Sequence, residues 1–100
     1  MHYVYIARCS DGSLYTGWST DVLKRLQVHN SGRGAKYTRS RLPVTLVYAE
    51  VCKDKSAALS RERAIKSLTR QQKEQLIQSS GAAPGAVQAI SSQKEGVSLT

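Results

Sequence analysis

Two short apolar runs on either side of Asp11-Gly12 constrain this 100-residue chain most. Residues 3–7 are aromatic, β-branched or small, which is typical of a strand buried on both faces. Residues 14–18 contain a second run of strand-forming residues, and turn residues separate the two runs. The sequence therefore predicts an antiparallel β-hairpin at the start of one small domain.

The length of the hairpin loop decides whether two tyrosines can act together. A two-residue loop would place Tyr5 and Tyr15 on opposite faces of the sheet, because side chains alternate along a strand. A three-residue loop over residues 10–12 places both rings on one face and requires Gly12 to adopt the left-handed conformation, which glycine tolerates. We predict the three-residue loop.

In this register Tyr5 lies opposite Gly17, and Ala7 lies opposite Tyr15. Gly17 has no side chain and leaves space over the Tyr5 ring. Two ordinary core tyrosines would also satisfy this pattern, so the pair alone does not define a site.

The rest of the chain predicts helices and one further strand. In chain order we expect a helix over 21–31 that Thr20 caps and Gly32 ends, followed by an irregular basic loop over 32–43 and a strand over 44–50. A second helix should run from Asp54 or Ser56 to about Ser67. The last helix should start with a capping box of Thr69 and Gln72 and end at about Gln78. The order β-β-α-β-α-α predicts an α+β domain over residues 1–78, with a small three-stranded antiparallel sheet flanked by helices. Ser, Gly, Ala and Gln dominate residues 79–100, which predicts a disordered C-terminal tail.

The charge of the chain favours nucleic acid as a partner. The chain has 15 basic and 7 acidic side chains, and 14 of the basic and 6 of the acidic ones lie in residues 1–78, so the whole net charge of +8 belongs to the expected domain. Positive charge on a compact body attracts polyanions, although a merely soluble basic surface is an alternative explanation.

No segment of the sequence indicates a membrane protein or a zinc site. No run reaches the roughly 20 apolar residues that a membrane span needs. Cys9 and Cys52 lie far apart without a Cys-x-x-Cys spacing, which argues against structural zinc and for reduced thiols. We therefore expect a cytoplasmic protein.

The loop over residues 32–43 concentrates cations around one aromatic residue. It contains Arg33, Lys36, Arg39 and Arg41, with Tyr37 among them. This pattern suits a nucleic-acid backbone and base stacking, whereas a solvated basic loop is the simpler alternative.

The first predicted helix carries a polar stripe. Asp21, Arg25 and His29 follow one another at steps of four, so they share one helix face. Because this helix starts directly after the hairpin, Arg25 and His29 can face the tyrosines. Arginine suits a phosphoryl oxygen because its planar guanidinium binds it with two hydrogen bonds, although an Asp21–Arg25 surface pair is the alternative.

Glu62 interrupts the apolar stripe of a later helix. The inward positions of that helix are Ala58, Leu59, Ile65 and Leu68. A carboxylate on such a stripe is costly unless it is paired or binds a metal ion. Pairing with Lys66 or Arg63 is one explanation; the other is that the single carboxylate holds Mg²⁺ or Mn²⁺, which keep several water ligands.

These motifs together resemble the GIY-YIG endonuclease superfamily, and in particular its small stand-alone bacterial members. The resemblance covers nearly all of residues 1–78 and rests on the segments Tyr3-Val4-Tyr5, Tyr15-Thr16-Gly17, Asp21-x-x-x-Arg25, Gly32-x-Gly34-Ala35-Lys36-Tyr37-Thr38 and the helical Glu62. It implies a catalytic set of Tyr5, Tyr15, Gly17, Arg25, His29 and Glu62, in which Glu62 holds Mg²⁺ or Mn²⁺.

The resemblance implies metal-dependent hydrolysis of a phosphodiester bond, with DNA favoured over RNA. Tyr5 or Tyr15 would help to take the proton from the attacking water, and Arg25 would stabilise the charge on phosphorus. The ion held by Glu62 would stabilise the leaving oxygen.

One position departs from the family pattern. Several nucleases of the family place an asparagine in the helix after the metal-binding glutamate, but residues 69–78 contain none, and Glu74 is nearest by spacing. A nucleic-acid-binding module with little or no cleavage is therefore the alternative. A plain protein-interaction domain is a third possibility.

Overall fold

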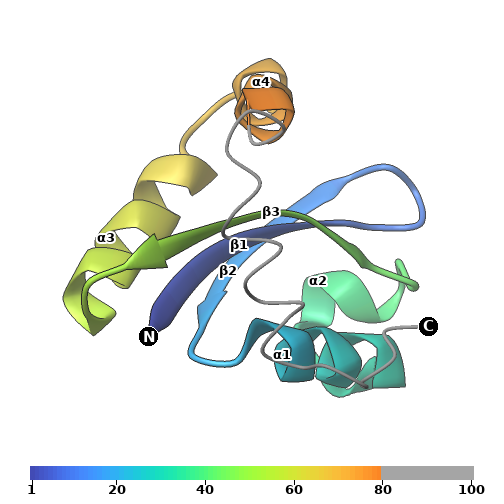
Figure 1. The fold of residues 1–100 in the computed structure, drawn as a ribbon. Helices are drawn as coiled ribbons and strands as arrows, with labels where there is room; N and C mark the ends of the chain where they lie inside the picture. Colours follow the sequence, from blue (N-terminus) through green and yellow to red (C-terminus); the bar gives the residue numbers. More distant parts are fainter. Residues whose placement is uncertain (80–100) are drawn as a thin grey trace.

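The computed structural model describes residues 1–79, which form a three-stranded antiparallel sheet between two helical layers. The strand order is β2-β1-β3, with β1 at His2–Arg8, β2 at Leu14–Ser19 and β3 at Thr45–Cys52. Helices α1 and α2 lie on one side of the sheet, and α3 and α4 lie on the other (Figure 1). The α+β class and the order β-β-α-β-α-α are confirmed.

The hairpin has the predicted three-residue loop. Gly12 has a φ of 85°, and the amide of Cys9 donates to the carbonyl of Ser13 at 2.8 Å. Tyr5 pairs with Gly17 and Ala7 pairs with Tyr15. The predicted register is confirmed, and both tyrosine rings lie on the same face of the sheet.

The first helical layer differs from the prediction at its start. Helix α1 covers Val22–Val28, and Asp21 caps it by accepting a hydrogen bond from the amide of Lys24 at 3.2 Å. The prediction that Thr20 caps this helix is wrong, because the helix begins one residue later and the carboxylate of Asp21 reaches the free amide.

The chain continues from α1 into a π-helical turn, η1, over His29–Arg33. Gly32, with a φ of 85°, ends the helical path as predicted. The segment expected to be irregular then contains a short helix, α2, over Lys36–Arg39. A single helical turn is too short to produce an apolar periodicity, so the pattern could not indicate it.

The second helical layer starts with two side-chain caps. Helix α3 covers Lys55–Lys66, and its cap Asp54 accepts from the amide of Ala57 at 2.8 Å. Helix α4 covers Arg70–Ser79 and follows the predicted capping box. In that box the Thr69 amide donates to Gln72 Oε1 at 2.9 Å, and the Gln72 amide donates to Thr69 Oγ1 at 3.1 Å.

The expected C-terminal tail over residues 79–100 lies outside the described residues, apart from Ser79, which is the last residue of α4. Within residues 1–79, none of the helices combines the length and apolar character that crossing a membrane requires.

Alternating side chains of β1 build two separate cores. Tyr3, Tyr5 and Ala7 pack toward α1, in a core completed by Cys9, Val22, Leu23, Leu26, Val44 and Ala49. Val4 and Ile6 pack toward α3, in a core completed by Tyr48, Ala58 and Ile65. The tyrosine site and helix α3 therefore belong to opposite faces of the sheet.

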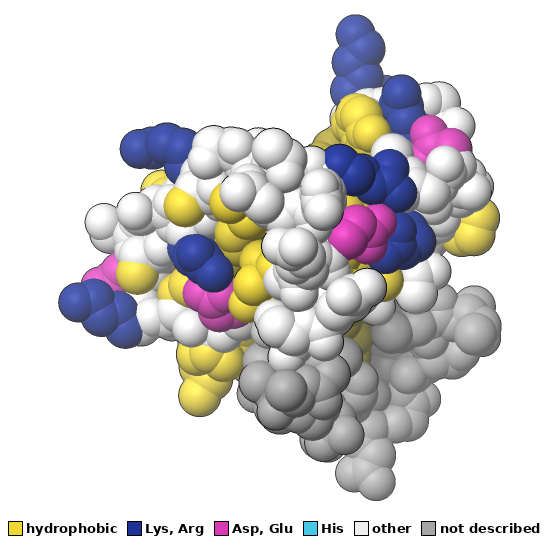
Figure 2. All heavy atoms as spheres, turned by 90° about the horizontal axis from the view of Figure 1, so that it is seen from above, with side chains coloured by type: hydrophobic (Ala, Val, Ile, Leu, Met, Phe, Trp, Pro, Cys, Tyr) yellow, Lys and Arg dark blue, Asp and Glu magenta, His cyan; other side chains and the backbone are white. Residues whose placement is uncertain are grey.

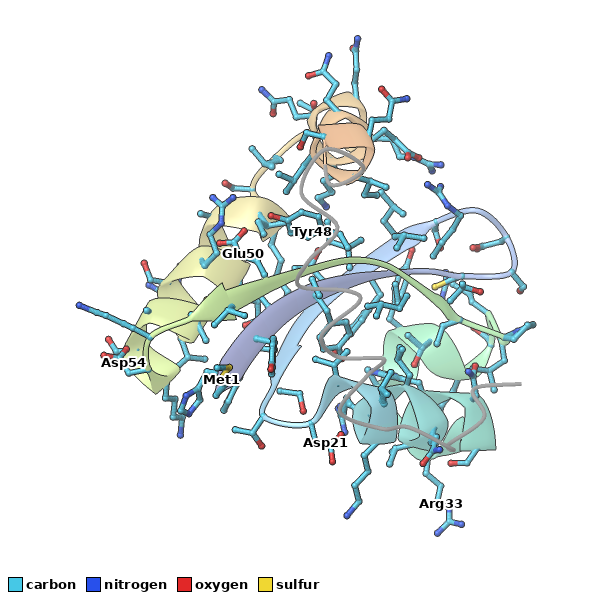
Figure 3. The ribbon with its side chains drawn as sticks, viewed as in Figure 1. Met1, Asp21, Arg33, Tyr48, Glu50 and Asp54 are labelled. Atoms are coloured by element: carbon cyan, nitrogen blue, oxygen red, sulfur yellow. The ribbon has the colours of Figure 1, made fainter. Side chains whose placement is uncertain are left out.

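A polar cluster ties β3 to α3. Figure 3 shows Tyr48 and Glu50 on β3, directed toward α3. The Tyr48 hydroxyl donates to Glu50 Oε1 at 2.5 Å, and Arg61 Nε donates to Glu50 Oε2 at 2.9 Å. Burial, followed by the bond to Glu50, raises the pKa of Tyr48 to about 12. This cluster belongs to the α3 face and does not include the Tyr5 side chain.

Candidate active site

Three aromatic residues meet on the α1 face of the sheet. The ring centroids of Tyr5 and Tyr15 are 6.4 Å apart, and the His29 ring lies 6.4 Å from Tyr5 and 5.1 Å from Tyr15. The Tyr5 hydroxyl and His29 Nε2 are 3.0 Å apart. β1, β2 and the end of α1 thus bring Tyr5, Tyr15 and His29 together.

Two of these groups are buried rather than open to solvent. Tyr5 is 1% exposed and His29 is 0% exposed, whereas Tyr15 is half-buried. Of the three rings, only Tyr15 reaches the surface. Their polar atoms must therefore find partners inside the protein.

Two glycines make room for this arrangement. A Cβ on Gly17 would lie 2.7 Å from the Tyr5 hydroxyl oxygen and 2.9 Å from Tyr5 Cζ. A Cβ on Gly34 would clash with His29 Nδ1 and lie 2.7 Å from His29 Cα. Gly17 therefore leaves space over Tyr5, as predicted, and Gly34 does the same for His29.

The second nitrogen of His29 has a buried partner that the sequence analysis did not assign to the site. His29 Nδ1 lies 2.9 Å from Thr38 Oγ1, and the Thr38 hydroxyl donates to the Ala35 carbonyl at 2.9 Å. Thr38 is 0% exposed and lies on α2. A chain of polar groups thus runs from Tyr5 through His29 to the backbone of the following loop.

The environment shifts the pKa values of both groups at the Tyr5–His29 contact. Burial, and then the neighbouring Tyr15, raise the pKa of Tyr5 far above its usual value of 10, although Arg25 acts in the opposite direction. Burial, and then the charge of Arg25, lower the pKa of His29 below its usual 6.5. Near neutral pH, Tyr5 is a phenol and His29 is a neutral imidazole.

Arg25 and Glu62 approach Tyr5 from different elements. The Arg25 guanidinium on α1 lowers the pKa of the Tyr5 phenol and the Glu62 carboxylate on α3 raises it, so both groups lie close enough to act on Tyr5. Helix α3 packs on the opposite face of the sheet from α1, where it contacts β1 and β2. The site therefore combines residues from both layers.

The surroundings of Glu62 suit a metal ion that needs few protein ligands. Its side chain is 19% exposed, and its Oε2 lies 3.8 Å from Lys66 Nζ, which is a long ion pair. Within residues 1–79, no three His, Cys, Asp or Glu side chains form a cluster. A single carboxylate fits Mg²⁺ or Mn²⁺, which take their other ligands from water and substrate phosphate, and does not fit a metal that needs a full protein cage.

The five residues expected to bind nucleic acid occupy different surroundings. Lys36 and Arg39 on α2 are exposed beside Tyr37, which is 40% exposed and stacks on Tyr15 with ring centroids 6.3 Å apart. Arg33 points away from the sheet at the far side of the first helical layer (Figure 3).

Arg41, the fifth of these residues, is engaged by neighbouring residues at the surface. Its Nε is 3.1 Å from Asp11 Oδ2, and its guanidinium donates to the Tyr37 carbonyl at 2.8 Å and lies 4.0 Å from the Tyr37 ring centroid. These contacts hold the hairpin loop and α2 together. Lys36 and Arg39, which are exposed, are therefore freer than Tyr37 and Arg41.

A hollow beside Tyr15 contains two lysines that the sequence analysis did not select for binding. The hollow has a volume of about 270 Å³ and is lined by Leu14, Tyr15, Thr16, Tyr37, Lys66 and Lys73. The buried hydroxyl of Thr16 has no partner among the described residues. Figure 2 shows Lys and Arg side chains outnumbering Asp and Glu on the face that carries α4. The hollow thus joins a catalytic candidate to a positively charged surface.

Glu74, which spacing suggested in place of the family's asparagine, does not point to the tyrosine site. Arg8 donates to both carboxylate oxygens of Glu74, at 2.7 and 2.9 Å, and Arg70 donates at 3.2 Å. These bonds, with Arg8 the largest influence, lower the pKa of Glu74 to about 2. Its neighbour Lys73 is the α4 residue that reaches the hollow.

The fold and the set of tyrosines, Arg25, His29 and Glu62 define a GIY-YIG domain. The family model of the GIY-YIG catalytic domain matches residues 1–75, and the chain belongs to this family. This finding confirms the resemblance to small single-domain members.

Several relatives of the chain are named UPF0213 proteins. It is 63% identical over 75 residues to a UPF0213 protein of Haloquadratum walsbyi, covering 75% of this chain and 84% of the relative. It is 59% identical over 76 residues to one of Staphylococcus aureus, covering 76% and 93%. A solution NMR structure of an E. faecalis protein is 46% identical, with a TM-score of 0.55 over 78% of this chain and 83% of that one.

Proposed function

We propose that the protein is a metal-dependent endonuclease that hydrolyses phosphodiester bonds in DNA. The observation that carries this proposal is the convergence of a buried phenol–imidazole pair, an arginine and one carboxylate. Tyr5 on β1, Arg25 and His29 at the end of α1, and Glu62 on α3 come from three parts of the chain, and the fold brings these parts together.

Arg25 supplies the positive charge of the proposed site. Its guanidinium stays protonated and binds phosphoryl oxygens in a planar geometry, so it stabilises the negative charge that develops on phosphorus. Its charge lowers the pKa of Tyr5, so the guanidinium acts in the neighbourhood of the phenol.

Tyr5 and His29 handle the proton in this proposal. The raised pKa of Tyr5 excludes a stable phenolate near neutral pH, so Tyr5 does not act as a preformed base. The lowered pKa of His29 keeps its ring neutral, which leaves one ring nitrogen as a proton acceptor. Tyr5 can therefore accept a proton from water as it passes its own proton to His29.

Glu62 would hold Mg²⁺ or Mn²⁺, which when bound supplies Lewis-acid stabilisation of negative charge on the phosphate. The partly exposed carboxylate and its long contact to Lys66 leave it available for this role. Tyr15, half-buried between His29 and Tyr37, would orient the substrate.

A cleavage assay with a matched control tests the proposal. The complete chain is incubated with Mg²⁺ or Mn²⁺ and with duplex, single-stranded and branched DNA, beside the variants Glu62→Gln and Glu74→Gln. Both variants remove one carboxylate charge and keep the side-chain size. We expect Glu62→Gln to abolish cleavage and Glu74→Gln to retain it, because only Glu62 is near Tyr5. Equal cleavage by Glu62→Gln and the parent would refute the proposed site, because the cleavage would then not depend on the Glu62 carboxylate.

We propose that DNA lies along the surface formed by Lys36, Tyr37, Arg39, Lys66 and Lys73. Each phosphate contact contributes about −0.9 to the slope of log affinity against log salt. Replacing Lys36 or Lys73 with alanine should flatten this slope by about one unit. The matched control, Lys53→Ala, changes an exposed lysine in the turn before α3 and should leave the slope unchanged. An unchanged slope for both variants would remove this surface from the interface.

A nucleic-acid-binding module with little cleavage is the second candidate. The specific observation in its favour is that Glu74, at the spacing of the family's asparagine, bonds Arg8 and Arg70 and does not point to the tyrosine site. If no DNA is cleaved by any version, but binding depends on Lys36 and Lys73, this function replaces the nuclease.

A further inference from the structure

The direction of each hydrogen bond around His29 can be worked out from the donors that surround it. Arg25, whose charge lowers the pKa of Tyr5, can only donate hydrogen bonds, so it offers the Tyr5 hydroxyl no acceptor. The Tyr5 hydroxyl proton still needs an acceptor, because Tyr5 is 1% exposed. His29 Nε2, at 3.0 Å, provides it, and Nε2 must then carry no proton.

The same conclusion follows from the other side of the ring. A neutral imidazole without a proton on Nε2 carries it on Nδ1. The atom facing Nδ1 is Thr38 Oγ1 at 2.9 Å, and the single hydroxyl proton of Thr38 is directed to the Ala35 carbonyl at 2.9 Å. Thr38 Oγ1 therefore presents a lone pair to Nδ1. Each group then donates to the next: the Tyr5 hydroxyl to His29 Nε2, His29 Nδ1 to Thr38 Oγ1, and the Thr38 hydroxyl to the Ala35 carbonyl.

We propose that Thr38 is a positioning residue that fixes His29 in the tautomer with its proton on Nδ1, so that Nε2 accepts the proton of Tyr5. This inference rests on the proposed function for its catalytic consequence, but not for the tautomer itself. Thr38 is fully buried on α2, and the absence of a Cβ on Gly34 lets the loop pack against the His29 ring. The opposite tautomer would place a proton on Nε2, against the Tyr5 hydroxyl, and His29 would have no lone pair there for the Tyr5 proton.

Nuclear magnetic resonance of the histidine rings tests the tautomer directly. The chain contains only His2 and His29, so a sample of the complete protein with ¹⁵N-labelled histidine gives two ring patterns, and a His2→Gln variant assigns them. We expect His29 of the parent to carry its proton on Nδ1. A parent His29 that carries its proton on Nε2 overturns the proposal without any variant at Thr38.

Two substitutions at Thr38 test its role. Thr38→Val keeps the shape but removes the hydroxyl, so the Nδ1 tautomer should lose its preference and Nε2–H should become populated. Thr38→Ser keeps the hydroxyl and should restore the parent pattern. Melting curves show whether each variant is folded; if Thr38→Val does not fold, the parent and Thr38→Ser spectra still decide. A folded Thr38→Val protein with the parent's tautomer overturns the proposal.

Kinetics add the functional arm. We expect Thr38→Val to lower kcat for DNA cleavage about 10- to 100-fold, as is usual for residues that orient a reacting group through another side chain. DNA affinity should stay within about twofold, because Thr38 is buried away from the substrate, and Thr38→Ser should recover kcat. An unchanged kcat in a Thr38→Val protein with altered tautomer refutes the catalytic consequence. If the parent cleaves no DNA, the nuclease proposal fails, and the ring spectra alone decide the tautomer.

Discussion

Replacing Gly17 with alanine probes the closest packing in the site. The added methyl group would lie 2.7 Å from the Tyr5 oxygen, 2.9 Å from Tyr5 Cζ and 3.1 Å from Tyr15 Cε2. Tyr5 is 1% exposed and bonded to His29, so it cannot rotate away freely. Overpacking of this kind costs about 1–3 kcal/mol, and the lower entropy of the unfolded alanine chain returns about 0.4–1 kcal/mol.

The net effect should be a loss of roughly 1–2 kcal/mol in the free energy of unfolding, measured by urea denaturation. For a domain of this size, each kcal/mol corresponds to a fall in Tm of about 4–8 °C. A Gly17→Ala protein that is as stable as the parent, or more stable, would refute the close approach of Gly17 and Tyr5.

A double-mutant cycle with Tyr5→Phe tests whether the loss of stability comes from the contact between residue 17 and the Tyr5 side chain. Removing the Tyr5 oxygen eliminates the 2.7 Å contact but leaves the ring carbon at 2.9 Å, so Gly17→Ala should cost less in the Tyr5→Phe background, but not nothing. We expect a coupling free energy of at least about 0.5 kcal/mol. Additive effects would show that the clash is relieved by movement elsewhere.

Three further predictions concern stability. Because burial lowers the pKa of His29, the unfolded chain binds a proton at this residue at a higher pH than the folded protein, so the contribution of His29 to the free energy of unfolding should be fully present above about pH 6.5 and decrease as the pH falls below it. In urea denaturation, the free energy of unfolding of His29→Asn should depend less on pH in this range. An identical pH profile for the two proteins would contradict this prediction. Because Arg8 lowers the pKa of Glu74 to about 2, the stability that this pair contributes should be present above pH 4.5 and lost as the pH falls toward 2. In thermal denaturation, Glu74→Gln should have a lower Tm than the parent at neutral pH and a similar Tm at pH 2. Equal Tm values at neutral pH would count against this prediction. Asp54→Ala should cost about 1 kcal/mol in chemical denaturation through loss of the α3 cap, and Asp54→Asn much less; equal losses would show that the cap bond contributes little.

The hairpin and the placement of its tyrosines could be predicted from sequence because two local rules decide them. Side chains alternate along a strand, and a three-residue loop needs a residue such as Gly12 that tolerates a positive φ. Both rules act within a few residues, so the pairing of Tyr5 with Gly17 followed without any knowledge of the helices.

The role of Thr38 could not be predicted in this way. Its partner His29 lies nine residues earlier, and the two are joined through a π-helical turn and a one-turn helix that have no periodic signal. The only available signal was that a buried imidazole needs a partner for each nitrogen. That rule requires a partner but does not identify it.

The sequence pointed to Glu74 on α4, whereas the structure places its neighbour Lys73 beside the site. Spacing along the chain selected Glu74, but successive residues of a helix point about 100° apart because a turn contains 3.6 residues. Glu74 faces Arg8, and Lys73 faces the hollow beside Tyr15. The direction of α4 is set by its packing on the second core, which spacing does not contain.

The position of β2 at the edge of the sheet has a consequence for how the protein behaves at high concentration. An edge strand exposes unpaired backbone groups that can join a strand of another copy and start aggregation. Lys66 and Lys73 lie beside this edge, at the hollow that includes Leu14 and Thr16. Their charges repel a second copy while leaving room for a polyanion. We therefore expect the same two lysines that we assign to DNA also to disfavour self-association through this edge, so a surface re-engineered to remove them would combine weaker DNA binding with a tendency to self-associate.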